Sequence, residues 1–153
     1  MKHTTIYLDM DGTFANLYAV EGWLEMLNAM NPTPYAQAKP IVRMATLAYY
    51  INALRKCGFR VGVISWLSKG ATCEYCEQVN TAKLAWLKKH LPSVEFDEIH
   101  IIPYGMPKYK VASEMGILVD DEKHNRDEWV DMGGTAVDAK YILDLFKFLK
   151  EGL

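Results

Sequence analysis

The feature that most constrains this chain is the apolar run Ile6–Leu8, which ends in two acids, Asp9 and Asp11, and a turn at Gly12 and Thr13. Alternate side chains of an extended strand point to opposite faces, so we expect Asp9 and Asp11 to leave the strand end on the same side. Two carboxylates this close repel each other, which raises one pKa or recruits a cation. In isolation an Asp-x-Asp pair is more often a solvated turn. The pair also suits a divalent metal with a nucleophile and a general acid.

An EF-hand calcium loop is the main alternative for these two acids. Such a loop needs Gly at its sixth position and Glu at its twelfth. Counted from Asp9, those positions hold Phe14 and Val20, so the sequence excludes an EF-hand.

The composition is that of an ordinary globular protein of one domain. The chain has 153 residues, half of them apolar and about a quarter charged, with a formal net charge of −2. Without a basic run, binding to nucleic acid driven by charge alone is disfavoured. No apolar run approaches the roughly 20 residues of a membrane span. Lys2 and His3 lead directly into the first strand without a leader, so we expect a cytoplasmic protein.

The cysteines do not indicate a metal site or a disulfide framework. Cys73 and Cys76 have the spacing of half a zinc site, but the chain offers no second pair, and only Cys57 remains. We expect ordinary positions near the start of a helix.

Strand-like and helix-like segments alternate along the chain. Strands are expected at 4–8, 59–64, 99–102, 117–119 and 135–137, and helices at 40–57, 72–90, 125–132 and 141–149. This alternation predicts an α/β fold with a doubly wound, Rossmann-like and mainly parallel five-stranded sheet, with helices on both faces. The segment 14–40 fits poorly, with a short helix around 21–30 and a proline-rich loop at 31–34.

Polar residues fall where the predicted strands end. Asp9 and Asp11 follow the first strand, Ser65 the second, and Asp120 and Asp121 the fourth. Ligands of open parallel sheets bind beyond the carboxyl ends of the strands, so these residues are candidates for one shared site.

The ordered set of motifs resembles the haloacid dehalogenase superfamily. Its four motifs match Asp9-x-Asp11-Gly-Thr13, Ser65, Lys110 and Asp120-Asp121 over nearly the whole chain except 14–40. The second half is most similar to the 5′(3′)-deoxyribonucleotidase family, through Lys83 and Trp86 on one helix, Lys110, and the run Asp120-Asp-Glu-Lys-His-Asn125. The resemblance implies a magnesium-dependent phosphomonoesterase in a single domain, with 14–40 as a reduced cap or lid.

The resemblance also implies roles for individual residues. Asp9 would be the nucleophile that becomes an aspartyl phosphate, and Asp11 the general acid and base. Asp9, Asp120 and the backbone carbonyl of Asp11 would hold Mg²⁺, with Asp121 supporting them. The phosphoryl oxygens would be bound by Ser65, Lys110, Gly12 and Thr13.

Chemistry of the residues supports this implication. A site with four acids cannot hold an anionic phosphate monoester without cations, and an all-oxygen ligand set favours Mg²⁺ over zinc. A halide leaves without a proton whereas an ester oxygen needs one, so Asp11 favours a phosphatase over a dehalogenase.

Several alternatives stay open at this stage. Lys108 competes with Lys110 for the phosphate, although the spacing to Asp120 favours Lys110. Lys83 is expected on a solvated helix face or as a structural support. The aromatic residues Trp23, Tyr35, Tyr49 and Tyr50 belong either to the core or to a substrate pocket.

The short segment 14–40 leaves the substrate open. The leading candidate is a small phosphate monoester such as a deoxynucleotide. A reduced cap would also admit a nucleic-acid end, or a partner chain in a homo-oligomer would complete the pocket. A non-catalytic module that binds metal or nucleotide is the third alternative.

Overall fold

Five parallel strands form the central sheet of the computed structural model, which describes residues 4–153. Their order across the sheet is β5 (Glu98–Ile102), β4 (Arg60–Trp66), β1 (Thr5–Leu8), β6 (Ile117–Asp120) and β7 (Thr135–Asp138). The chain moves outward from β1 first to one edge and then to the other, so the winding reverses at β1. This confirms the predicted doubly wound α/β fold. The expectation drawn from Lys2 and His3 lies outside the described residues.

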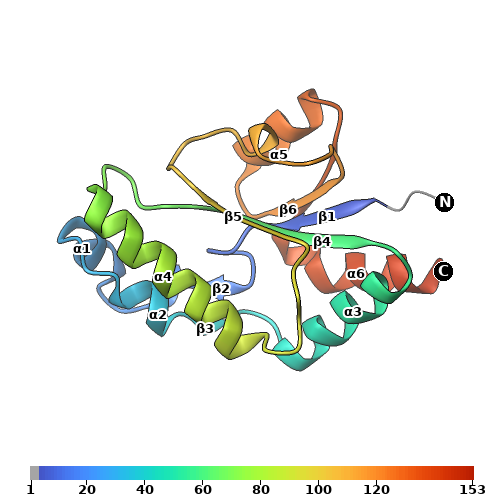
Figure 1. Cartoon of the computed structure of the whole chain (residues 1–153), viewed down its shortest axis with the longest axis horizontal. Helices are drawn as coiled ribbons and strands as arrows, with labels where there is room; N and C mark the ends of the chain where they lie inside the picture. Colours follow the sequence, from blue (N-terminus) through green and yellow to red (C-terminus); the bar gives the residue numbers. More distant parts are fainter. Residues whose placement is uncertain (1–3) are drawn as a thin grey trace.

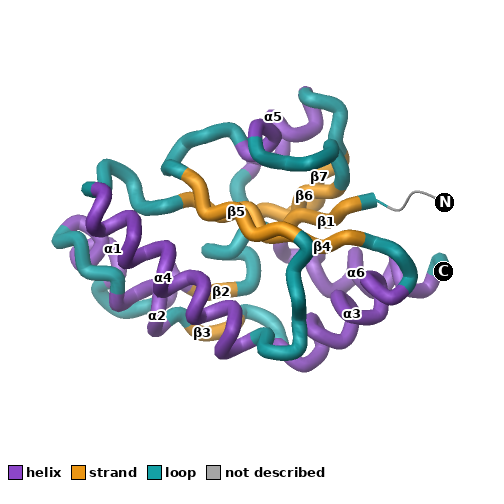
Figure 2. The backbone as a smooth tube through the Cα atoms, viewed as in Figure 1, coloured by secondary structure: helices purple, strands orange, loops and turns teal. Residues whose placement is uncertain are grey.

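Helices cover both faces of this sheet (Figures 1 and 2). On one side lie α3 (Met44–Lys56), α4 (Cys73–His90) and α6 (Ile142–Glu151), and on the other lies α5 (Lys123–Asp131). Among the described residues, no helix combines the length and apolar character needed to cross a membrane.

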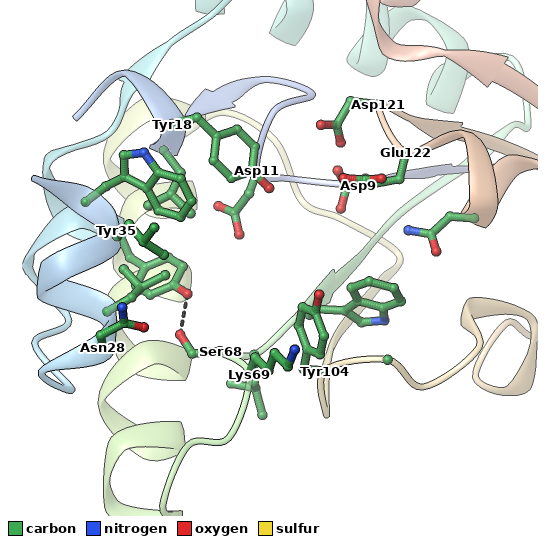
Figure 3. Close-up of a pocket in the computed structure, with 18 of the residues that line it drawn as sticks. Asp9, Asp11, Tyr18, Asn28, Tyr35, Ser68, Lys69, Tyr104, Asp121 and Glu122 are labelled. Carbon is green, nitrogen blue, oxygen red and sulfur yellow. Dashed lines mark hydrogen bonds between the residues drawn. The ribbon is translucent and has the colours of Figure 1, made fainter. Parts of the chain in front are cut away.

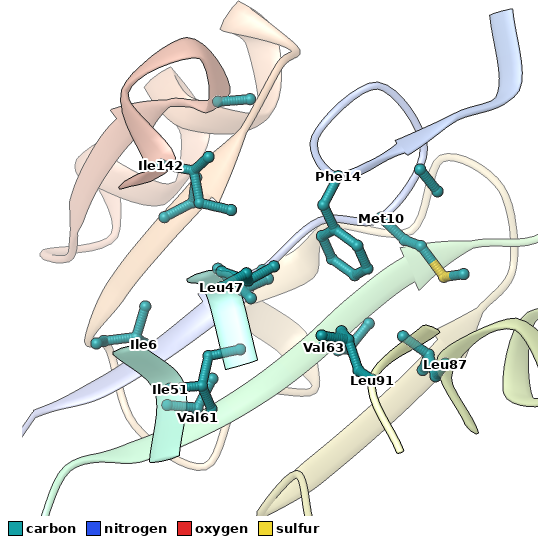
Figure 4. Close-up of a cluster of buried hydrophobic side chains, with 14 of the residues drawn as sticks. Ile6, Met10, Phe14, Leu47, Ile51, Val61, Val63, Leu87, Leu91 and Ile142 are labelled. Atoms are coloured by element: carbon teal, nitrogen blue, oxygen red, sulfur yellow. The ribbon is translucent and has the colours of Figure 1, made fainter. Parts of the chain in front are cut away.

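The alternation of side chains along β1 divides the core into two layers. Ile6 and Leu8 belong to the larger cluster, which includes residues of α3, α4 and α6 (Figure 4). Tyr7 points to the opposite face, where its ring lies 5.6 Å from that of Trp129 on α5. Burying an aliphatic or aromatic side chain of this size contributes about 1.5–3 kcal/mol, so both layers hold β1 at the centre of the sheet.

The segment 14–40 is more structured than the sequence indicated. It contains β2 (Ala15–Asn16), a 3₁₀ turn η1 (Leu17–Ala19), α1 (Trp23–Asn28), α2 (Thr33–Gln37) and β3 (Lys39–Pro40). The prediction of a loop at 31–34 is wrong in its second half, because α2 begins at Thr33. Pro34 lies in the first turn of this helix, where a backbone N–H would have no partner within the helix, so its absence costs nothing.

Two helix boundaries depend on the residues before them. The helix expected from Pro40 begins only at Met44, because Pro40 pairs with Ala15 between β3 and β2. The helix expected from Thr72 begins at Cys73, and Oγ1 of Thr72 caps it by accepting a hydrogen bond from the backbone N–H of Tyr75.

Packing against α4 holds the segment 14–40 beside the carboxyl edge of the sheet. Nε1 of Trp86 donates a hydrogen bond of 2.7 Å to the carbonyl of Ala38, and the Tyr75 hydroxyl donates one of 3.1 Å to the carbonyl of Asn31. Buried Leu17, Tyr35 and Val79 share a separate apolar cluster with Tyr75. This position places the segment over one side of the strand ends.

Candidate active site

Two acids from neighbouring strands meet at the carboxyl edge of the sheet, where the winding reverses. Asp9 follows β1, and its backbone N–H donates to the carbonyl of Val119 on β6. Asp120 is the last residue of β6. The ammonium of Lys108 lies between them, 2.7 Å from Oδ1 of Asp9 and 2.7 Å from Oδ2 of Asp120. The predicted convergence of these acids is therefore confirmed.

The structure brings Lys108, rather than Lys110, to these acids. Lys108 is 3% exposed and touches both acids, whereas Lys110 is exposed to solvent. Both belong to the 3₁₀ turn η2 (Lys108–Lys110), in which residues two apart point in very different directions. When Lys108 points inward, Lys110 therefore faces outward. Among the described residues Lys108 uses two N–H donors, and its third remains available to a ligand.

The carboxylate of Asp9 is held at both oxygens. Lys108 donates to Oδ1, and the Thr13 hydroxyl donates to Oδ2 at 2.9 Å. Burial raises the pKa of Asp9, but the Lys108 charge and the hydrogen bonds from Asp121, Lys108 and Thr13 outweigh it, so its pKa lies below the ordinary value. Asp9 is therefore an oriented, ionised carboxylate.

A third acid joins this pair. Carboxylate oxygens of Asp9, Asp120 and Asp121 lie within 4.8 Å of one another. Burial and the nearby Asp9 charge raise the pKa of Asp120 to about 6, although Lys108 opposes the rise. Burial, the hydrogen bond with Asp9 and the neighbouring charges raise the pKa of Asp121 to about 9. Three acids in one place thus carry more negative charge than Lys108 alone can balance.

The residues present fit a divalent cation. Oδ1 of Asp121 is buried without a hydrogen-bond partner in the described part of the chain, which is costly unless a cation binds there. Gly12 has φ of +80°, and a Cβ at that position would overlap the Asp121 carboxylate. Oxygen ligands of this kind suit Mg²⁺. Asp121, expected only to support the ligands, therefore lies where it could bind the cation directly.

Two residues of α5 form hydrogen bonds with Asp120. Nδ2 of Asn125 donates to Oδ2 of Asp120 at 3.1 Å, and the Arg126 guanidinium donates to its backbone carbonyl at 3.0 Å. Asn125, the last residue of the run Asp120–Asn125 noted in the sequence, is buried within α5. Its contact fixes the carboxylate that Lys108 also binds.

Asp11 lies beside these acids but has a different partner. The ammonium of Lys83, from the middle of α4, donates to its Oδ2 at 2.7 Å. Burial raises the pKa of Asp11 above the ordinary value, and Lys83 only partly offsets the rise. The expectation that Lys83 lies on a solvated face is wrong, because its side chain is fully buried. The sequence carried a signal: Tyr75, Val79 and Lys83 recur at the spacing of one helix face.

The residues expected to bind phosphate have other contacts. Backbone N–H groups of Gly12 and Thr13 donate within the turn, to the carbonyls of Ala15 and Met10. Oγ of Ser65 accepts from Lys83 at 2.7 Å, and Ser65 is 1% exposed. A phosphate-binding role for Ser65, Gly12 and Thr13 stays a prediction.

A cavity of about 560 Å³ opens onto the acids (Figure 3). Asp9 and Asp11 both line it, which confirms that they leave the strand on the same side. The other walls carry five aromatic side chains, of Tyr18, Trp23, Tyr35, Trp66 and Tyr104.

The aromatic residues left open by the sequence are now assigned. Trp23 and Tyr35 line the cavity, and Tyr50 packs against the larger core cluster. For Tyr49 both alternatives are wrong, because its side chain is exposed on α3. Trp66 also lines the cavity, with its ring 5.0 Å from that of Tyr104 and 5.5 Å from the Lys108 ammonium.

The cysteines lie outside this site. Cys73 begins α4 and is exposed, and Cys76 is partly buried on the next turn. Within residues 4–153, neither belongs to a group of side chains that could hold a metal. Both cysteines lie near the start of a helix, as expected.

Comparison with solved structures identifies the same fold in two enzymes. D,D-heptose 1,7-bisphosphate phosphatase from Burkholderia thailandensis superposes with a TM-score of 0.54 and 14% identity, over 86% of this chain and 74% of that one. A HAD-family enzyme from Bacteroides thetaiotaomicron gives a TM-score of 0.55 and 9% identity, over 90% and 94%. At such identities the likeness concerns the fold. No protein-family model and no curated protein matches this sequence.

Proposed function

We propose that this chain is a phosphomonoesterase of the haloacid dehalogenase superfamily, with Asp9 as the nucleophile. The observation that carries the proposal is the environment of Asp9: Lys108 and Thr13 fix its two oxygens at the edge of a cavity that Asp11 also lines. The shared fold with a heptose bisphosphate phosphatase and a HAD-family enzyme supports the assignment. So does the order of the motifs along the chain.

The reaction proceeds in two displacements. A carboxylate oxygen of Asp9 forms a bond to phosphorus while the ester P–O bond breaks, and Asp11 gives its proton to the departing oxygen, which leaves as an alcohol. Asp11, now a carboxylate, removes a proton from a water molecule. The resulting hydroxide attacks the aspartyl phosphate at phosphorus, which releases phosphate and restores Asp9.

The separation of the two acids suits this division of work. Asp9 belongs to the cluster with Asp120 and Asp121, which the Lys108 ammonium contacts and which could hold a cation. Asp11 is bound instead by Lys83, outside that cluster, and can exchange a proton with a leaving group in the cavity. The third N–H of Lys108 is available to a phosphoryl oxygen, whose negative charge it would stabilise.

Asp9, Asp120 and Asp121 would hold Mg²⁺, together with the backbone carbonyl of Asp11 that the family resemblance implies. When bound, Mg²⁺ would neutralise the charge of phosphate and acids and polarise a phosphoryl oxygen. Oδ1 of Asp121, which has no hydrogen-bond partner among residues 4–153, supports the presence of the cation.

For the substrate we propose a nucleotide, as the similarity to 5′(3′)-deoxyribonucleotidases suggests. Two pairs of aromatic rings that line the cavity, Tyr18 with Trp23 and Trp66 with Tyr104, would accept a planar base. The segment 14–40 supplies the first of these pairs and would act as a reduced cap that limits access of water.

Phosphate release from a panel of monoesters with Mg²⁺ tests the proposal. We expect wild-type protein to hydrolyse p-nitrophenyl phosphate and at least one deoxynucleotide, and Asp9→Asn to hydrolyse neither. Faster release from the end of an oligonucleotide than from any mononucleotide would replace the substrate assignment. Tight binding of nucleotide without turnover would reject the enzyme.

A further inference from the structure

Lys83 is a fully buried charge beside the proposed reaction centre. Its side chain is 0% exposed, and it comes from α4 rather than from a strand end. Its ammonium donates to Oδ2 of Asp11 at 2.7 Å, to Oγ of Ser65 at 2.7 Å and to the backbone carbonyl of Trp66 at 2.6 Å. A protonated lysine has three N–H donors, so all three are used.

This saturation distinguishes Lys83 from Lys108. Lys108 keeps one donor for a ligand, whereas Lys83 has none left for a phosphoryl oxygen. Lys83 also does not line the cavity, although Asp11 does. The position of Lys83 is therefore suited to holding Asp11 and unsuited to binding substrate.

The contact decides which oxygen of Asp11 can carry a transferable proton. Oδ2 receives an N–H from Lys83, and a proton on that oxygen would face another donor. A proton on Asp11 therefore resides on Oδ1. The two anchors on β4, the Ser65 hydroxyl and the Trp66 carbonyl, keep the ammonium in place while that proton leaves and returns.

We propose that Lys83 is a positioning residue that orients Asp11 for proton transfer to the leaving group. The inference rests on the phosphatase proposed above. Tyr35 joins the arrangement from the segment 14–40, because its ring centroid lies 5.0 Å from the Lys83 ammonium and its hydroxyl bonds to Ser68. The Tyr35 ring thereby adds a cation–π contact to the three hydrogen bonds of the ammonium.

The experiment compares two leaving groups in Lys83→Met, which removes the donors and keeps a long apolar side chain. A nitrophenolate leaves without a proton, whereas the alkoxide of an alkyl phosphate needs one from Asp11. The comparison uses kcat/KM, because this ratio reports the steps up to formation of the aspartyl phosphate and leaves out the water step that both esters share. We expect kcat/KM for the alkyl phosphate to fall about 100-fold, within the range typical of general acid catalysis. We expect kcat/KM for p-nitrophenyl phosphate to fall less than about tenfold.

Lys88→Met is the matched control, since Lys88 lies on the same helix and is exposed. It should hydrolyse both substrates like wild type. Ser65→Ala is the second variant in case Lys83→Met does not fold: it keeps the ammonium and removes one anchor. In Ser65→Ala we expect a smaller loss of kcat/KM than in Lys83→Met, and again a greater loss for the alkyl phosphate than for p-nitrophenyl phosphate.

The outcomes separate this inference from the proposed function. Equal losses of kcat/KM for both substrates in Lys83→Met, or in Ser65→Ala if only that variant folds, would overturn the positioning role of Lys83 while leaving the phosphatase intact. A rise in KM with kcat unchanged would also overturn it, because that result indicates substrate binding. Wild-type protein that hydrolyses neither ester would instead reject the phosphatase.

Discussion

The ammonium of Lys108 lies 2.7 Å from Oδ1 of Asp9, although 99 residues separate them along the chain. The same ammonium reaches Asp120 at the end of the neighbouring strand. One buried cation therefore joins the loop after β5 to the ends of β1 and β6. This contact brings together three of the four motifs and lies at the centre of the proposed chemistry.

Lys108→Met should lower kcat/KM for p-nitrophenyl phosphate by about 10²–10³-fold, which is typical for loss of one donor to a developing negative charge. Lys110→Met is the matched control, because Lys110 has the same side chain two residues away and is exposed. Steady-state kinetics with Mg²⁺ checks both. Loss of activity in Lys110→Met with retention in Lys108→Met would reverse the assignment.

Mg²⁺ should stabilise the wild-type protein through the acids. A ligand present at 100 times its Kd contributes about 2.7 kcal/mol, which for a chain of this size raises Tm by roughly 5–10 °C. In Asp121→Asn the rise should be much smaller, because one oxygen ligand is lost. Thermal unfolding with and without Mg²⁺ gives both values. Equal rises in the two proteins would exclude Asp121 as a ligand.

The metal-free protein should lose stability as the pH rises. The pKa of Asp121 is about 9 in the fold, above the ordinary 3.8. The neutral Asp121 carboxyl therefore contributes to the stability of the fold. This contribution is complete below pH 3.8 and is lost as the pH rises through 9, because the buried carboxyl must then ionise. Asp121→Asn keeps a neutral group, so its metal-free Tm should fall less between pH 7 and 9. Parallel pH curves would contradict this.

Gly12→Ala should cost stability and activity together. Gly12 has φ of +80°, and the added Cβ would also overlap the Asp121 carboxylate and come within 2.9 Å of the Tyr18 ring. We expect a loss of more than about 2 kcal/mol in the free energy of unfolding. In Gly133→Ala the backbone strain is similar, with φ of +97° and open space around the Cβ, so its smaller loss isolates the overlap. Urea titrations measure the loss in the free energy of unfolding of both variants. Equal losses would show that the overlap with Asp121 and Tyr18 has no effect on stability.

Glu98 should stabilise the fold at neutral pH. Burial opposes its charge, but hydrogen bonds from His100, Ser113, Tyr7 and Arg60 lower its pKa to about 2, from 4.5. The stabilisation is therefore present above pH 4.5 and is lost as the pH falls toward 2.

Glu98→Gln should accordingly lower the free energy of unfolding by up to about 3 kcal/mol at pH 7, and by less than half as much at pH 3. Glu95→Gln, at an exposed position nearby, serves as the control. Chemical denaturation at both pH values measures the difference. A loss that is independent of pH would show that the charge of Glu98 is not responsible.

The sheet and the meeting of the acids could be predicted because both depend on local patterns. Apolar runs such as Val61–Ile64 become buried strands, and the carboxyl ends of parallel strands share one edge. Asp9 and Asp120 each follow such a run directly, so no long-range detail was needed to place them together.

The two lysines could not be assigned in the same way. Lys108 and Lys110 belong to one turn, and only packing of the loop around Trp66 and Met106 decides which points inward. Lys83 lies in the buried face of a helix, where a lone cation is stable only beside a carboxylate brought there by another strand. Spacing in the sequence does not reveal such partners.

Trapping the covalent intermediate tests the central claim most directly. Borohydride reduces an aspartyl phosphate to homoserine, which peptide mass spectrometry locates in the sequence. We expect homoserine at position 9 after incubation of the wild-type protein with Mg²⁺ and p-nitrophenyl phosphate, and none without the ester. Steady release of phosphate with no homoserine at position 9, or with homoserine at Asp11, Asp120 or Asp121 instead, would contradict Asp9 as the nucleophile.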